Sequence, residues 1–137
     1  MPENKKKKHV SLVVGGDYHD IDYVRHKLLG FLLETPNLRT RCFENFNDMD
    51  NICQADYLIT YTCNVVPRPE QVPQLRNFLT SGKRWLALHG TNSWLALDKN
   101  KQWYTPPGHE KYFELLGSQF AAHPPIEPYV VKISDNN

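Results

Sequence analysis

The chain has 137 residues, enough for one domain with a buried core, and 40% of them are hydrophobic, which argues against disorder. Its 16 Lys and Arg residues nearly balance 15 Asp and Glu residues, so charge gives no case for nucleic acid as the main partner. No apolar stretch approaches a membrane span, and the first residues lack the apolar core of a signal peptide. The lack of a span predicts no membrane partner. Three cysteines without C-x-x-C spacing indicate reduced thiols, so we expect a cytoplasmic protein.

The chain opens with a lysine run, Lys5 to Lys8, and we expect residues 1–8 to form a disordered, solvated basic tail. The domain then occupies residues 9–137 and begins with a buried strand over 9–16, rich in β-branched residues and ended by two glycines. Asp20 is placed to cap a helix that ends before Pro36, because the residue before a proline disfavours helical geometry. Apolar side chains recur on one face of this helix at Ile21, Val24, Leu28 and Leu32.

Strands and helices continue to alternate through the middle of the chain. Residues 38–46 predict a second, more exposed strand, 48–53 a short helical turn, and 56–63 a third strand. A helix is expected from about residue 70, with Gly82 as its C-terminal stop. The fourth strand is expected at 84–88.

The last third of the chain is less regular. Residues 91–108 form an irregular, aromatic-rich segment, 110–120 return to helical spacing, and 128–133 predict a fifth strand. Alternation of this kind predicts an α/β fold with helices on both faces of a sheet. We therefore expect a flavodoxin-like three-layer sandwich with a mostly parallel five-stranded sheet.

Polar side chains follow three of the predicted strands, at 15–20, 61–64 and 89–92. In the strand order 2-1-3-4-5 these strand ends are neighbours near the topological switch point, where open α/β sheets bind ligands. The third cluster is a sharp turn that carries His89 where related folds place a Ser or Cys nucleophile. The sequence therefore predicts a site at this edge that lacks the usual Ser or Cys nucleophile.

Three residues at this edge are candidates for catalysis. His89 could act as a general acid or base, or be a half-buried histidine satisfied by backbone groups. His19, flanked by Asp17 and Asp20, could assist it or bind a metal, or could simply face water beside a helix cap. Cys63 would be a nucleophile if a neighbouring base lowered its pKa, and otherwise an inert buried side chain.

Other residues could bind a ligand or a metal. His19, His89 and His123 could together hold a divalent metal such as zinc, although none shares the short spacing of a specific metal motif. Trp94 and Trp103 could stack on a sugar ring or pack in the core or a lid. The cofactor therefore stays unknown at this stage.

Four motifs in order along the chain resemble the ThuA-like (trehalose utilisation) family, of the class I glutamine amidotransferase-like superfold. They are Val13 to Asp20, Leu58 to Cys63, Trp85 to Asn92, and Leu115 to Gly117 followed by His123 to Pro125. The resemblance implies a flavodoxin-like sandwich and a link to sugar catabolism in bacteria. It implies no glutaminase activity, because His89 stands where the superfold has its catalytic Cys.

By residue, the resemblance implies a pocket lined by His19, Tyr61, Cys63, His89, Asn92 and His123. We expect four residues to bind the substrate: Asp17, Tyr61, Asn92 and His123. Members of the family usually continue for roughly another hundred residues, so we expect the chain to be truncated at its C-terminus and to expose apolar surface.

These observations favour a ThuA-like protein that acts on a small-molecule sugar or sugar derivative, with His89 as acid/base. One alternative is a non-catalytic ligand-binding or assembly module on the same fold. Another is a thiol hydrolase that uses Cys63. The substrate, the reaction type and the presence of a metal stay open, as does assembly into a homo-oligomer.

Overall fold

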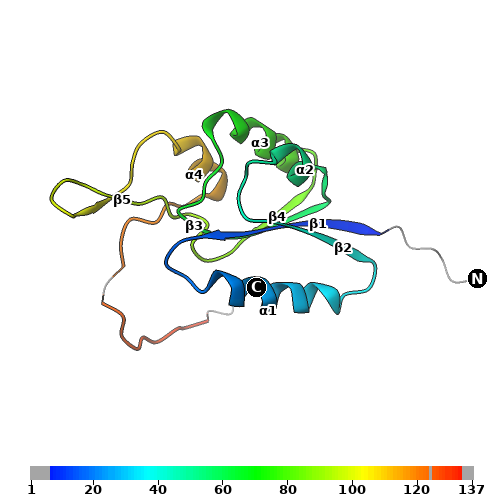
Figure 1. The fold of residues 1–137 in the computed structure, drawn as a ribbon, viewed down its shortest axis with the longest axis horizontal. Coiled ribbons are helices and arrows are strands. Elements are labelled where there is room, and N and C mark those ends of the chain that lie inside the picture. The colour runs from blue at the N-terminus through cyan, green and yellow to red at the C-terminus, as the bar shows by residue number, and fades with distance from the viewer. Residues whose placement is uncertain (1–6, 124, 134–137) are drawn as a thin grey trace, which may run out of the picture.

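The computed structural model describes residues 7–123 and 125–133. Its sheet has four parallel strands in the order β2-β1-β3-β4 (Figure 1). The strands are β1 (Lys8–Gly16), β2 (Leu38–Phe43), β3 (Tyr57–Cys63) and β4 (Arg84–Ala87). The helices are α1 (Ile21–Leu33), α2 (Met49–Gln54), α3 (Val72–Thr80), entered through the 3-10 turn η1 (Pro69–Gln71), and α4 (Glu110–Leu116).

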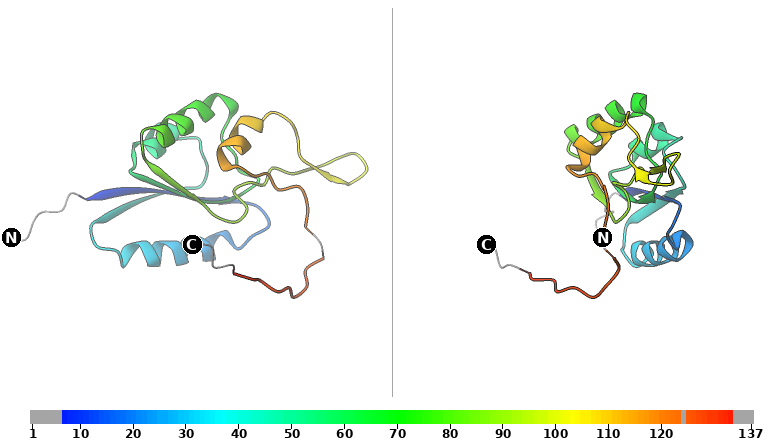
Figure 2. Two further views of the ribbon diagram at one scale, coloured as in Figure 1. Left: turned by 180° about the vertical axis from the view of Figure 1, so that it is seen from behind. Right: turned by 90° about the vertical axis from the view of Figure 1, so that its left-hand side faces the viewer.

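The sheet lies between two helical layers (Figure 2). Helix α1 covers one face, and α2, α3 and α4 cover the other. Successive residues of β1 point to opposite faces, so Leu12 and Val14 pack toward α1 while Val13 joins the core under the other helices. The α/β character of the fold and its mostly parallel sheet are confirmed, and both are consistent with a flavodoxin-like fold.

The predicted helix signals act as expected. The Asp20 side chain accepts a hydrogen bond from the Tyr23 N–H at 3.1 Å and caps α1. The short turn expected over 48–53 forms as α2, and Asp48, for which no cap was predicted, accepts a hydrogen bond from the Asn51 N–H there. Gly82 follows the end of α3 with φ of +83°, the left-handed conformation that glycine adopts most readily.

Several expectations need correction. The fifth strand predicted at 128–133 does not form: this segment has no sheet partner and its side chains are exposed. Helix α4 ends at Leu116, short of the expected residue 120, because Gly117 takes a left-handed conformation with φ of +71°. Similarly, β2 ends at Phe43, where the sequence predicts a strand to residue 46.

Other differences lie at the start of the chain and in the irregular segment. Residues 1–6 of the expected basic tail lie outside the described residues, and β1 begins at Lys8. The irregular segment contains a small antiparallel hairpin of β5 (Ala96–Leu97) and β6 (Trp103–Tyr104). Figure 1 shows this hairpin projecting beyond the end of the sheet.

Part of the sheet face beside α1 is open. A hollow of about 360 Å³ with a mostly apolar lining lies there, near the amino ends of the strands, and Ile59 and Leu86 contribute to it. Leu86 is 54% exposed, and the large hydrophobic side chains of the segment 126–133 are more exposed still, from 70% at Val131 to 96% at Ile126. Within the described ranges, no helix is long and apolar enough to cross a membrane.

Candidate functional site

The first wall of the site is built where β1 ends beside β3. Gly16 pairs with Cys63 in the parallel register, and the Asp17 N–H donates to the Cys63 carbonyl at 3.1 Å. A Cβ atom at Gly16 would lie 1.8 Å from that carbonyl oxygen, and its φ is +112°. Glycine is therefore required here for the chain to stay against β3 before it leaves the sheet at Asp17–Asp20.

The second wall is the turn that follows β4. The Leu88 N–H donates to the Thr60 carbonyl at 2.8 Å, which extends the β3–β4 pairing by one bond. Gly90 then turns the chain with φ of +83°, and a Cβ atom there would lie 2.5 Å from the Thr62 carbonyl oxygen. This close approach leaves His89 beside the end of β3, as the predicted elbow requires.

Buried hydrogen bonds hold this turn in place from below. The Thr91 hydroxyl donates to the Thr60 carbonyl at 3.1 Å, and the two threonine hydroxyls are also 3.1 Å apart. The Trp85 indole donates to the Thr60 hydroxyl at 2.9 Å. From α4, the Tyr112 hydroxyl donates to the Thr91 carbonyl at 3.0 Å. The turn is thereby tied to both β3 and α4, which favours a fixed position for His89.

Three rings from three strand ends meet at this edge. The ring centroids of His19 and His89 are 5.0 Å apart with an angle of 63° between the planes. The Tyr61 ring lies 5.8 Å from His19 and 6.2 Å from His89. His89 is exposed, whereas His19 and Tyr61 are half-buried. The structure thus brings together residues 19, 61 and 89, which the sequence analysis assigned to one edge.

The histidine pair has an electrostatic consequence. Burial lowers the pKa of His19 below its ordinary value, and the adjacent His89 imidazole lowers it further. Two imidazolium ions at this separation would repel each other, so a charged His89 ring disfavours a proton on His19. His19 is therefore favoured as a neutral imidazole near pH 7, with a ring nitrogen able to accept a proton or a hydrogen bond.

Cys63 has the opposite character to an activated nucleophile. Its side chain is buried, and burial raises the pKa of the thiol. The Asp17 carboxylate raises that pKa further, and a hydrogen bond with Ser93 opposes the shift only in part. The thiol form therefore predominates at neutral pH, which fits a packed side chain better than an attacking thiolate.

The remaining predicted ligand-binding residues lie around the pair. Asp17 is exposed at the start of the first loop. The Asn92 amide donates to the Ser118 hydroxyl at 3.0 Å, and the Asn92 carbonyl accepts from the Phe120 N–H at 3.0 Å, so Asn92 anchors the segment after α4. His123 lies farther along this segment, with its ring 6.0 Å from that of Phe120.

The three histidines that could have bound a metal, His19, His89 and His123, form no metal site in the described structure. Among the described residues, no group of three or more His, Cys, Asp or Glu side chains is arranged to hold a metal ion. His19 and His89 supply two adjacent imidazoles, whereas protein zinc sites use at least three protein ligands. This pair alone therefore does not fit a zinc ion.

The two tryptophans of the irregular segment have different positions. Trp94 is half-buried, packs against the core under α3 and α4, and contacts the His109 ring at 5.0 Å. Trp103 in β6 is exposed and meets the Tyr18 ring edge-to-face at 5.7 Å. Tyr18 could not be identified from the sequence, because its contact with Trp103 depends on the position of the hairpin, which no local pattern reveals.

The arrangement supports proton transfer and ligand binding at the carboxyl edge of the sheet. An imidazole can accept a proton from a ligand or donate one to it. The Tyr61 hydroxyl can donate a hydrogen bond to a ligand oxygen. In comparisons with known proteins, the chain matches no protein-family model, no curated protein and no solved structure.

Proposed function

We propose that this chain is a ThuA-like protein that acts on a sugar derivative in bacterial carbohydrate catabolism, with His89 as acid/base. One observation carries the proposal: His89 and His19 come from separate strand ends and meet at the carboxyl edge of a parallel sheet. Ligands bind at this edge in open α/β folds. The sequence motifs that resemble the ThuA-like family supply the sugar as the class of substrate.

The two imidazoles take different roles. His89 is exposed and can reach a bound ligand, so it transfers the proton to or from the reacting oxygen or carbon. His19 is half-buried with a lowered pKa, so it stays neutral and orients the His89 ring or accepts a hydrogen bond from the substrate. Tyr61, between the two strand ends, donates a hydrogen bond to a sugar oxygen.

The residue at the elbow and the free cysteines bear on the reaction type and on the cellular compartment. The elbow holds an imidazole in place of a thiol, so covalent acyl transfer of the amidotransferase type is not part of it. The free cysteines Cys42, Cys53 and Cys63 fit a reducing compartment such as the cytoplasm.

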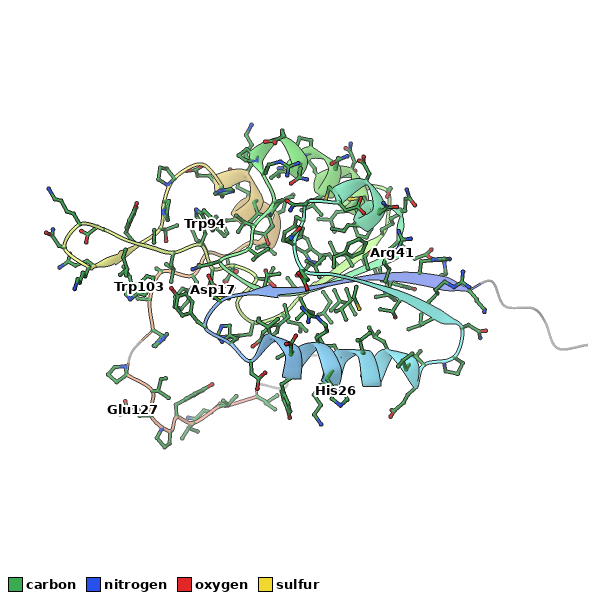
Figure 3. All side chains as sticks on the ribbon, viewed as in Figure 1. Asp17, His26, Arg41, Trp94, Trp103 and Glu127 are labelled. Carbon is green, nitrogen blue, oxygen red and sulfur yellow. The ribbon has the colours of Figure 1, made fainter. Side chains whose placement is uncertain are left out.

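The test is a turnover assay with α,α-trehalose and a panel of free, methylated and oxidised hexoses, with products followed by NMR. The proposal expects conversion of one of these compounds. His89→Gln should slow it by about 10²- to 10⁴-fold, the usual contribution of a general acid or base. His26→Gln is the matched control, because Figure 3 places His26 on the outer side of α1, away from the sheet.

Two results would contradict the proposal. Conversion of none of the compounds by the wild-type protein would remove the assigned substrate class. Binding of a sugar that weakens in His89→Gln without any turnover would identify a binding module in place of an enzyme.

A further inference from the structure

Two exposed aromatic rings, one of them from the residue just before His19, contact each other. The Tyr18 and Trp103 ring centroids are 5.7 Å apart, with the planes at 89°. Tyr18 is 69% exposed and Trp103 is 52% exposed, so neither ring is buried in the core. They come from the loop after β1 and from β6, and Figure 3 shows Trp103 beside the loop that carries Asp17.

The backbone at Tyr18 is unusual for such a large residue. Its φ is +67°, in the left-handed region that bulky side chains rarely adopt. Residues held in this region cluster at ligand-binding and catalytic sites, where the surrounding structure imposes the conformation. Here the conformation leaves an exposed aromatic ring next to His19 in the chain, and the His19 ring contacts His89.

The groups around the two rings define the class of ligand. Exposed aromatic faces stack on flat apolar surfaces, and an edge-to-face pair offers two such surfaces at a right angle. The Asp17 carboxylate and the His19 imidazole, on either side of Tyr18 in the chain, provide hydrogen-bonding partners for polar groups. A pyranose ring combines an apolar C–H face with a rim of hydroxyl groups, so it matches both features.

We infer that Tyr18 and Trp103 form a stacking subsite that holds a pyranose ring beside the His19–His89 pair. This inference rests on the proposed function for the identity of the ligand as a sugar, and it assigns the residues that select a ring-shaped substrate. The β5–β6 hairpin then acts as one wall of the binding site, since it supplies Trp103.

The experiment measures binding of two probes by ligand-observed NMR. Methyl α-D-glucopyranoside has the ring face, whereas sorbitol is an acyclic polyol without it. The wild-type protein should bind the pyranoside and discriminate against sorbitol. Trp103→Ala and Tyr18→Ala should each weaken pyranoside binding by about tenfold, and Trp103→Phe should retain most of it because a ring face remains.

Tyr104→Ala is the matched control. Tyr104 is the next residue of β6 and is 47% exposed, but its side chain points to the other face of the hairpin. This variant should bind the pyranoside as the wild type does. Equal loss in Tyr104→Ala and Trp103→Ala would indicate disruption of the hairpin and would overturn the inference.

The inference is also overturned if the wild type binds neither probe, or binds both equally. Its failure is distinguishable from failure of the proposed function. Pyranoside binding that depends on Trp103 and shifts the ring signals of His19 and His89, without turnover of any compound in the panel, supports the subsite and counts against the acid/base role. Turnover that depends on His89 but is unchanged in Trp103→Ala supports the function and removes the subsite.

Discussion

At the scale of single residues, the site depends on two glycines that let strand ends approach each other. Gly16 and Gly90 adopt positive φ values, and a side chain at either would collide with a backbone carbonyl of β3. These contacts hold against β3 the start of the loop that carries His19 and the turn that directly follows His89. The local sequence indicates tight turns here, but the collision partners become visible only once β3 is placed between the two segments.

Replacing Gly90 separates the steric effect from the conformational one. Gly82 has the same φ of +83° but nothing near its Cβ position, so Gly82→Ala should lower the free energy of unfolding by about 1–2 kcal/mol. Gly90→Ala carries that cost and also overpacks against Thr62, for roughly a further 1–3 kcal/mol. Urea unfolding of both variants checks this, and equal losses would contradict the close packing of the turn on β3.

The pKa of His19 reports the proximity of the two imidazoles. Because burial and then His89 lower it, His89→Gln should raise the pKa of His19 toward its ordinary value of about 6.5. The unfolded chain binds this proton more readily than the folded chain, so stability should fall as the pH drops below about 6.5. Titration of the His19 ring by NMR measures the shift, and His26→Gln should leave it unchanged. An identical His19 titration in His89→Gln would show that the rings do not interact.

At the scale of elements, sequence patterns predicted most of the sheet and the helices that cover it. Helix α1 was predictable because it has a capping Asp and an apolar face, and β1 and β3 because they are short, β-branched runs. The strand predicted at 128–133 failed for a different reason. Its composition favours extended backbone, but a strand also needs a partner, which composition does not supply.

The contact between α4 and the turn after β4 is the least obvious link from sequence. Tyr112 is fully buried and its hydroxyl donates a hydrogen bond to the Thr91 carbonyl. Helical spacing predicts the burial of Tyr112 but not this hydrogen bond. Tyr112→Phe removes the hydroxyl donor, so the Thr91 carbonyl loses this hydrogen bond and the free energy of unfolding should fall by about 1–3 kcal/mol. Chemical denaturation checks this.

The control for that prediction is Tyr104→Phe, because Tyr104 is exposed on the hairpin. Surface substitutions of this kind usually change stability by no more than about 0.5 kcal/mol. A Tyr112→Phe protein as stable as Tyr104→Phe would show that α4 does not anchor the turn through this hydrogen bond.

At the scale of the whole molecule, the site is a product of topology. His19, Tyr61 and His89 are far apart in sequence, and the strand order β2-β1-β3-β4 brings their strand ends to one edge. The alternation of strands and helices was sufficient to predict this convergence. It was insufficient for the position of the hairpin, of Trp103 and of the segment that carries His123, because these lie outside the regular layers.

The central claim is that His19 and His89 act together on a sugar. The most direct measurement is a titration of the protein, labelled with ¹⁵N at histidine, with α,α-trehalose and with each hexose of the turnover panel. We predict that the ring signals of His19 and His89 shift together and saturate at one affinity, while those of His26 on the far side of α1 stay unchanged. Saturable binding of a sugar that leaves both His19 and His89 unshifted, or no binding of trehalose or of any hexose of the turnover panel, would contradict the account.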